Sequence, residues 1–220
     1  MKTTAHTVLL TGFEPFGGEP ENPSLAIARA LDRKRVAGHR IVGAALPTEF
    51  ARSLPVLEML LRQHRPALVL AVGQAGGRAL ISLERVAINL IDARIADNAD
   101  DQPVDVPVIR DGPNAYFSTL PLKAMLLRLH AAGIPAALSH SAGTFVCNQV
   151  FFGLVHYLAT HKPHARGGFV HVPYLPQQAA RHDNAPSMAL PTMIEAIRLC
   201  IETALTSDDN DVRYAAGSLD

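Results

Sequence analysis

Apolar strand-like runs alternate with segments of helical periodicity along this 220-residue chain, and this alternation constrains the fold more than any other feature. Strand-like runs are found at residues 7–11, 40–46, 67–72, 81–91, 136–138 and 168–172. Helical spacing of apolar residues is found at residues 23–31, 50–61, 122–129, 150–158 and 193–205. Parallel strands joined by helices are covered on both faces of their sheet. The sequence therefore predicts an α/β fold with a largely parallel sheet between helices.

Several residues mark where the predicted helices begin and end. Asn22 suits an N-cap, and Pro23 suits the first helical position, where its missing N–H costs nothing. Pro55 interrupts the helical pattern of residues 50–61 and predicts a kink or a later helix start. Gly133 is the expected end of the helix that begins near residue 122.

Two segments are expected to lie outside the regular elements. Residues 92–112 are acidic and contain prolines, which predicts a surface excursion or a hairpin. The tail from Ser207 onward is polar and is expected to fray. No linker or internal repeat separates parts of the chain, so residues 1–220 are expected to form a single α/β domain.

Composition excludes several classes of function. Nearly half of the residues are apolar, and 20 basic residues balance 20 acidic ones, which argues against nucleic acid or an anionic membrane as the main partner. No apolar run approaches the ~20 residues of a membrane span. Two cysteines and the lack of a hydrophobic leader after Met1 predict a cytoplasmic protein without a disulfide framework.

The run SHSAGTFVCN at residues 139–148 places Cys147 after a Gly143-Thr144 turn that leads into a helix. The positive end of a helix dipole and nearby unpaired N–H groups favour the thiolate, which is the nucleophilic form of cysteine. A buried structural cysteine is the alternative interpretation.

A cysteine nucleophile needs a base, and the base needs an orienting partner. His171 interrupts the apolar strand of GGFVHVPY and is the best candidate for the base, with His140 in reserve; a hydrogen-bonded core histidine is the alternative. Glu84 lies in the extended run ISLERVAIN and could orient the imidazole, although it could also be a solvent-facing strand residue. Its neighbour Arg85 points to the opposite face of a strand and cannot simply neutralise it.

The loop GFEPFGG follows the first predicted strand and carries Phe13 and Phe16. It lacks both GxGxxG and the lysine of a phosphate-binding loop, so its two rings are better suited to walling a flat, uncharged ring. From the loop alone, ordinary core packing of the two rings remains the favoured interpretation. No CxxC, HxH or HExxH spacing is present, so we expect neither a metal site nor a cofactor.

Five motifs in order resemble the pyrrolidone-carboxylate peptidases, the family of cysteine peptidases also called pyroglutamyl peptidase type I. These motifs are GFEPFGGEPENPS, GQAGGR with ISLERVAIN, DARIADN, SAGTFVCN and GFVHVPYLPQQ, and the match extends from Leu9 to about Leu205. The resemblance implies a three-layer α/β/α sandwich with a mostly parallel, twisted sheet of the phosphorylase/hydrolase-like kind. It also implies removal of N-terminal pyroglutamate (5-oxoproline) from peptides through a thioester, and a homo-oligomer, specifically a tetramer.

The resemblance assigns roles to residues of the matching motifs. It implies a catalytic triad of Glu84, Cys147 and His171, with Arg94 near the oxyanion region. Aromatic residues that would enclose the lactam ring are Phe13, Phe16 and Phe145, and residues that would contact it mainly through their backbone are Gln74 and Val146. The surface-charge interpretation of Arg94 remains open.

Two other functions are compatible with the same sheet. One is a non-catalytic small-molecule-binding protein that uses GFEPFGG as its ligand loop. The other is a nucleoside-phosphorylase-like enzyme, which would use its glycine loops for phosphate and would not need Cys147. Alkylation of the thiol discriminates, because it should abolish a cysteine peptidase and leave both alternatives largely intact.

Overall fold

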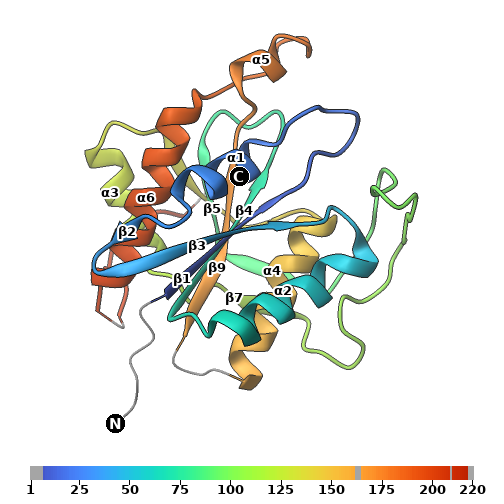
Figure 1. The fold of residues 1–220 in the computed structure, drawn as a ribbon, viewed down its shortest axis with the longest axis horizontal. Helices are drawn as coiled ribbons and strands as arrows, with labels where there is room; N and C mark the ends of the chain where they lie inside the picture. The colour runs from blue at the N-terminus through green and yellow to red at the C-terminus, as the bar shows by residue number, and fades with distance from the viewer. Residues whose placement is uncertain (1–6, 162–164, 209, 218–220) are drawn as a thin grey trace.

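The computed structural model describes residues 7–161, 165–208 and 210–217, and a seven-stranded sheet forms its centre (Figure 1). The strand order is β2-β3-β1-β4-β9-β5-β8. The strands are β1 (Thr7–Phe13), β2 (Arg35–Val36), β3 (His39–Leu46), β4 (Leu68–Gln74), β5 (Ile81–Glu84), β8 (Ala136–Ser139) and β9 (Arg166–Val172). Parallel pairing joins β1 to β3 and β4, β4 to β9, and β5 to β8. The prediction of a mostly parallel sheet is thus confirmed.

Two pairings of the sheet are antiparallel. The short edge strand β2 pairs with β3, and β5 pairs with β9 inside the sheet. The strands β5 and β8 therefore run opposite to β4 and β9. This reversal places the start of β5 beside the carboxyl end of β9, where Ser82 is aligned with His171.

Helices cover both faces of the sheet and enclose two hydrophobic cores (Figure 1). One face carries α1 (Pro23–Leu31), α3 (Leu122–Ala131) and α6 (Leu190–Thr206). The other face carries α2 (Phe50–His64) and α4 (Val146–His161). A short helix, α5 (Pro176–Ala179), follows β9. This three-layer arrangement matches the sandwich that the sequence motifs implied.

The helix starts follow the local chemistry of the chain. Asn22 is the N-cap of α1, and its side chain accepts a hydrogen bond from the Ser24 amide at 3.0 Å, as predicted. Of the two outcomes predicted at Pro55, a kink or a later helix start, the later start is wrong, because α2 begins at Phe50 and contains Pro55. The side chain of Asp97 accepts a 2.6 Å hydrogen bond from the Phe50 amide and so supplies a cap that the local sequence does not show.

The extended run predicted at residues 81–91 is broken at Arg85. Its second part forms β6 (Val86–Ile88), which pairs with β7 (Ala115–Phe117) in a separate two-stranded sheet. The excursion that follows β6 is held by an isolated bridge between Ile91 and Val106 and by the buried Asp97, rather than by a regular hairpin.

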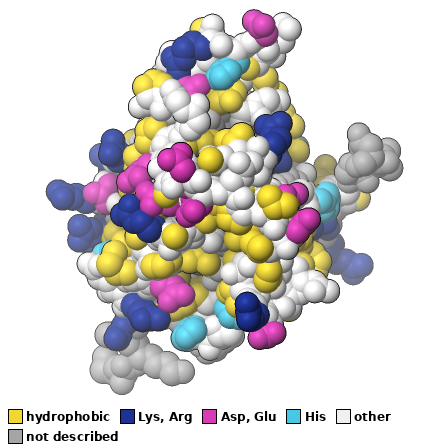
Figure 2. Space-filling model, turned by 90° about the vertical axis from the view of Figure 1, so that its right-hand side faces the viewer, with side chains coloured by type: hydrophobic (Ala, Val, Ile, Leu, Met, Phe, Trp, Pro, Cys, Tyr) yellow, Lys and Arg dark blue, Asp and Glu magenta, His cyan; other side chains and the backbone are white. Residues whose placement is uncertain are grey.

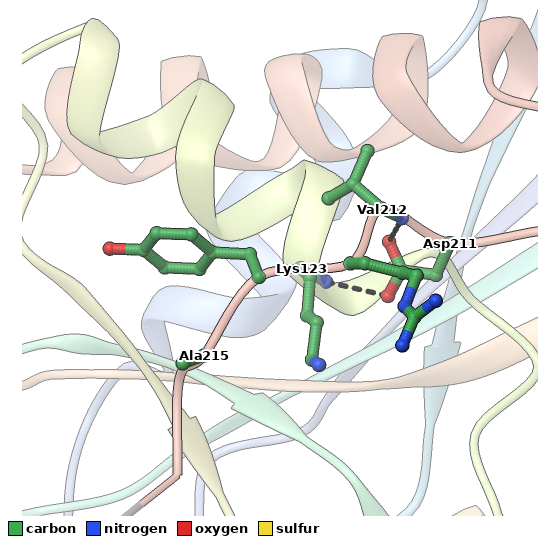
Figure 3. A pocket seen from close by; sticks show the side chains of 6 residues that line it. Lys123, Asp211, Val212 and Ala215 are labelled. Atoms are coloured by element: carbon green, nitrogen blue, oxygen red, sulfur yellow. Dashed lines mark hydrogen bonds between the residues drawn. The ribbon is translucent and has the colours of Figure 1, made fainter.

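The tail is docked on the body of the protein at Asp211, contrary to the expectation that it would fray; residues 209 and 218–220 of this tail lie outside the described residues. The carboxylate of Asp211 accepts a 2.8 Å hydrogen bond from the amide of Lys123, at the start of α3 (Figure 3). It also accepts a 3.0 Å hydrogen bond from the amide of Ala124. The tail thereby provides the N-terminal cap that Pro121 cannot supply with its own side chain.

The surface of the molecule agrees with the balanced charge of the chain. On the face shown in Figure 2, acidic and basic side chains lie interspersed with hydrophobic ones. Within the described residues, no helix combines the length and the apolar character needed to cross a membrane.

Candidate active site

The candidate nucleophile lies at the start of α4. The chain leaves β8, turns through Gly143 at a φ of 79°, and enters the helix so that Cys147 is its second residue. The Thr144 hydroxyl donates a 2.7 Å hydrogen bond to the Asp92 carbonyl, and the Asp92 amide donates back to the Thr144 carbonyl at 3.0 Å. These two bonds fix the turn that presents the thiol.

Buried amide side chains next to Cys147 anchor the helix. Asn148 accepts from the Ile88 amide at 3.1 Å and donates to the Ile88 carbonyl at 2.9 Å. Gln149 donates to the Phe50 carbonyl at 2.9 Å. Because both amides are buried and hydrogen-bonded, α4 cannot rotate without leaving polar groups unsatisfied. The sequence analysis singled out neither residue.

The thiol of Cys147 lies against the end of β4. A Cβ atom built on Gly73 would be only 2.9 Å from Sγ, so only glycine leaves room for the sulphur at this point. Gly73 is aligned with His171 on the neighbouring strand β9. The sheet therefore brings the strand of the predicted base to the sulphur of the predicted nucleophile.

Glu84 and His171 meet because β5 and β9 are antiparallel. Glu84 is aligned with Phe169, and His171 is two residues further along β9 and therefore on the same face. Oε1 of Glu84 and Nδ1 of His171 are 2.7 Å apart, and the side chains are 0% and 5% exposed. A carboxylate can only accept this bond, so Nδ1 carries the hydrogen and Nε2 is left to exchange a proton.

A third polar group in this arrangement, Arg78, was missed by the sequence analysis. Its Nη1 donates to the same Oε1 of Glu84 at 2.7 Å, and its Nη2 donates to the Ser141 carbonyl at 3.0 Å. The signal that could have found it is the charge of Glu84 itself, which needs a cationic partner that the adjacent Arg85 cannot be. Arg78 ends the GQAGGR motif and is six residues before Glu84.

The surroundings of the thiol disfavour its ionisation, contrary to the thiolate expected at a helix start. Burial, followed by the negative charge of Glu84, raises the pKa of Cys147 to about 12, whereas the positive charge of Arg78 lowers that pKa. Part of the residue remains exposed, but Sγ itself is shielded by β4. Desolvation of the sulphur thus disfavours the thiolate, and a base is needed to take the thiol proton.

The predicted aromatic residues separate into two positions. Phe16 and Phe145 are half-buried, with ring centroids 6.2 Å apart, and Phe50 meets Phe145 edge-on at 5.1 Å. Phe13 is 1% exposed and packs 6.2 Å from Phe169 in the core. Phe16 and Phe145 are the pair with accessible surface for a ligand.

Of the remaining predicted binding residues, Gln74 lies at the end of β4 and Val146 at the start of α4. Gln74 is 8% exposed, and its side chain accepts a 2.9 Å hydrogen bond from the fully buried Gln178. Val146 is fully buried at the first position of α4. Arg94 is exposed, and its guanidinium has no hydrogen-bond or ion-pair partner within the part of the chain that the structure describes. The structure therefore does not bring Arg94 into contact with the other predicted site residues.

A buried carboxylate–imidazole pair next to a shielded thiol, on a helix-covered α/β sheet, defines a hydrolase of the cysteine-peptidase class. The family model described as pyroglutamyl peptidase matches residues 6–207, and the chain belongs to this family. It is 56% identical over 213 residues to pyrrolidone-carboxylate peptidase 1 of Ralstonia nicotianae, covering 97% of this chain and 99% of the relative. It is 54% identical to the pyrrolidone-carboxylate peptidase of Bacillus cytotoxicus, covering 90% of this chain and 93% of that relative.

Solved structures agree with this membership. The crystal structure of pyroglutamyl peptidase I from Bacillus amyloliquefaciens superposes with a TM-score of 0.93 at 43% identity, covering 96% of this chain and all of that chain. The pyrrolidone carboxyl peptidase from Thermococcus litoralis gives a TM-score of 0.90 at 39% identity, covering 95% of this chain and all of that one. The predicted family and fold are both confirmed.

Proposed function

We propose that this chain removes N-terminal pyroglutamate from peptides, with Cys147 as the nucleophile, His171 as the general base and Glu84 as the residue that orients the imidazole. The observation that carries the assignment of roles is the 2.7 Å bond between the buried Glu84 and His171 side chains. His171 lies on β9, next to β4, whose residue Gly73 packs against the Cys147 thiol. Membership of the pyroglutamyl peptidase family supplies the substrate class.

The raised pKa of the thiol determines the first step. As Sγ attacks the pyroglutamyl carbonyl carbon, the thiol proton passes to Nε2 of His171, and Glu84 stabilises the imidazolium that results. The imidazolium then protonates the departing amine as the C–N bond breaks, which leaves a thioester on Cys147. Water, deprotonated by the neutral imidazole, hydrolyses the thioester, releases pyroglutamate and restores the thiol.

The oxyanion formed in both tetrahedral intermediates needs hydrogen-bond donors. The first N–H groups of a helix have no acceptor within it, and Cys147 lies in the first turn of α4. We assign its backbone N–H to the oxyanion, where one such donor is commonly worth ~3 kcal/mol of transition-state stabilisation. Arg94 would join it only if its exposed side chain turned toward the site when substrate binds.

Specificity is assigned to the absence of charge in the substrate lactam. Phe16 and Phe145 offer flat apolar walls, and Gln74 and Val146 offer backbone groups at a strand end and a helix start. Phe13 contributes from the core, where it packs against Phe169. A pyroglutamyl ring has no ammonium group, whereas an ordinary N-terminus would have to shed its hydration without an acidic partner. The site should therefore reject glutaminyl and glutamyl N-termini.

The decisive experiment compares two cysteine variants on a pyroglutamyl amide. Cys147→Ser should remain folded and lose hydrolysis, whereas Cys200→Ser, changed in the core-facing side of α6, should retain it. A glutaminyl amide with the same leaving group serves as the substrate control. Equal turnover by wild type and Cys147→Ser would reject the nucleophile, and comparable kcat/KM for the two amides would reject the substrate class.

We further propose that residues 1–220 act as one peptidase domain and that the chain forms a homo-oligomer, a tetramer according to the family resemblance. Large apolar side chains that remain exposed support an interface: Phe117 is 71% exposed and Val104 is 59% exposed. Light scattering coupled to size-exclusion chromatography tests this proposal, and a monomer at micromolar concentration would contradict it.

A further inference from the structure

We propose that Arg78 is a positioning residue of this reaction, because its guanidinium joins the carboxylate that orients His171 to the loop that presents Cys147. The inference rests on the proposed function and adds to it a residue that the predicted triad does not contain. Arg78 reaches neither the thiol nor the imidazole by a hydrogen bond, so it acts through Glu84 and through the loop.

The guanidinium links three segments of the chain. Its Nη1 donates to Oε1 of Glu84 at 2.7 Å, on β5, and lies 3.4 Å from the Ser139 hydroxyl at the end of β8. Its Nη2 donates to the Ser141 carbonyl at 3.0 Å, in the loop that continues to Cys147. The position of the nucleophile loop is thereby coupled to the position of the carboxylate.

The carboxylate depends on this bond because its other oxygen has no support. Glu84 is 0% exposed, and Oε2 is buried without a hydrogen-bond partner among the described residues. Oε1 accepts from both Arg78 and His171, each at 2.7 Å. Burying an ionised carboxylate is costly unless donors and a counter-charge compensate it, and Arg78 supplies both.

The shared oxygen fixes the direction of the imidazole as well. The Glu84 side chain has rotatable bonds, so with His171 as its only partner it could swing and carry the imidazole along. Because Arg78 also donates a hydrogen bond to Oε1, from a second direction, the carboxylate and the imidazole ring of His171 are held in one orientation. Misplacement of a reacting group by about 1 Å can lower a rate by about 100-fold.

The charge of Arg78 also reaches the thiol. Two charged groups among the described residues act on Cys147: Glu84 raises the pKa of the thiol, and Arg78 lowers it. His171 is aligned with Gly73, against which the thiol packs. Without Arg78 the charge of Glu84 would act on the thiol unopposed. Ionisation of Cys147 should then move to higher pH.

Arginine suits this position better than lysine. The two nitrogens of its planar fork serve two acceptors that belong to different segments, Glu84 and Ser141. A lysine could place its single charge near Glu84 but could not hold both acceptors in the same way. The Arg78 side chain is 36% exposed, so its guanidinium keeps part of its hydration and loses little solvation by forming these bonds.

The first experiment measures kcat and KM for Arg78→Met and Arg78→Lys on a pyroglutamyl amide. We expect kcat of Arg78→Met to fall by about 10- to 100-fold with KM changed by less than about threefold, and Arg78→Lys to be intermediate. Arg198→Met is the matched control, because Arg198 is 34% exposed and also pairs with a glutamate, on α6. Its kcat should remain within about twofold of wild type.

The second experiment follows the pH dependence of Cys147 alkylation by iodoacetamide, with peptide mapping to separate it from Cys200. It needs no substrate, so it tests Arg78 even if the proposed substrate proves wrong. The alkylation midpoint should move to higher pH in Arg78→Met. In a separate assay on the pyroglutamyl amide, added guanidinium ion should restore part of the kcat of Arg78→Ala. A merely structural role would produce neither result.

The proposal is overturned if Arg78→Met has the kcat and the alkylation midpoint of wild type. It is also overturned if kcat/KM of this variant falls only because KM rises. If Arg78→Met does not fold, Arg78→Lys decides: a lowered kcat at an unchanged melting temperature supports the bridge, and a wild-type kcat overturns it. Wild-type protein that fails to hydrolyse the pyroglutamyl amide would reject the proposed function, while the alkylation profiles would still decide the role of Arg78.

Discussion

Replacing Gly73 with alanine would place one methyl group between the sheet and the candidate nucleophile. The added Cβ would lie 2.8 Å from Cζ of Phe169 and 2.9 Å from Sγ of Cys147. Gly73 is a regular residue of β4 outside the left-handed region of φ, so an alanine backbone fits there. The effect of the substitution is therefore purely steric.

The structure indicates which neighbour must yield. Ordinary contacts begin near 3.4 Å, so each atom has to withdraw by about half an ångström. Phe169 is fully buried between Phe13 and Phe151, with ring centroids 6.2 Å and 5.9 Å away, and cannot withdraw without displacing them. Cys147 is only half-buried as a residue, and its short side chain turns about a single bond, so the thiol is the group that moves.

We expect Gly73→Ala to lose about 1–3 kcal/mol of unfolding free energy, the usual cost of one extra methyl in a packed site. We also expect kcat to fall by at least about tenfold, because half an ångström of misplacement falls on the reacting atom itself. The assay combines urea denaturation with initial rates on a pyroglutamyl amide, normalised to folded protein.

Gly167→Ala is the matched control on the same sheet. Its Cβ would lie 2.5 Å from Cδ1 of Leu158, the tip of a flexible side chain, and Gly167 is near the start of β9 and far along the strand from His171. It should lose stability and keep its kcat. A folded Gly73→Ala with wild-type kcat, or an equal loss of kcat in both variants, would refute the placement of the thiol against β4.

Two further predictions concern stability away from the site. Asp211→Ala removes the cap of α3 and should cost ~1 kcal/mol, visible as a lower melting temperature with unchanged kcat, while the exposed Asp208→Ala should change neither. Burial raises the pKa of Cys200 to about 12, so its thiol stays protonated in the folded chain while it ionises in the unfolded chain above pH ~8.5. Below pH ~8.5 the buried thiol does not reduce the free energy of unfolding. Between that pH and the folded pKa of about 12, this free energy falls by up to ~1.4 kcal/mol per pH unit. Urea titrations at pH 8 and 10.5 should show a smaller alkaline loss for Cys200→Ala than for wild type; equal losses would contradict this assignment.

The strands and helices could be predicted because each has a strong local signal. The apolar run of residues 7–11 became β1, and the Asn22-Pro23 pair starts α1 as its capping chemistry requires. The direction of β5 could not be predicted in this way. Apolar periodicity is the same for either direction of a strand, and the antiparallel pairing of β5 with β9 depends on contacts distant in sequence.

The same distinction applies to the caps and the site. Glu84 and His171 could be singled out because each places a polar group in an apolar run, where it needs a partner. Asp97 and Asp211 looked like surface charges, since the helix amides they cap are 47 and 88 residues away. Arg78 was missed for a related reason, because its partners on β5 and after β8 become neighbours only when the sheet has formed.

The register of β5 explains why the carboxylate and the imidazole can be held so closely. Glu84 is aligned with Phe169 on one side and with Ser139 on the other, so β5 is fixed between two neighbours. A slip by one residue would turn Glu84 to the opposite face of the sheet, toward the core of α1, α3 and α6, and would leave a buried charge without His171 or Arg78. The energetic penalty for that charge therefore opposes the misregistered sheet. The polar pair that we propose for catalysis thus also favours the strand pairing that brings its two members together.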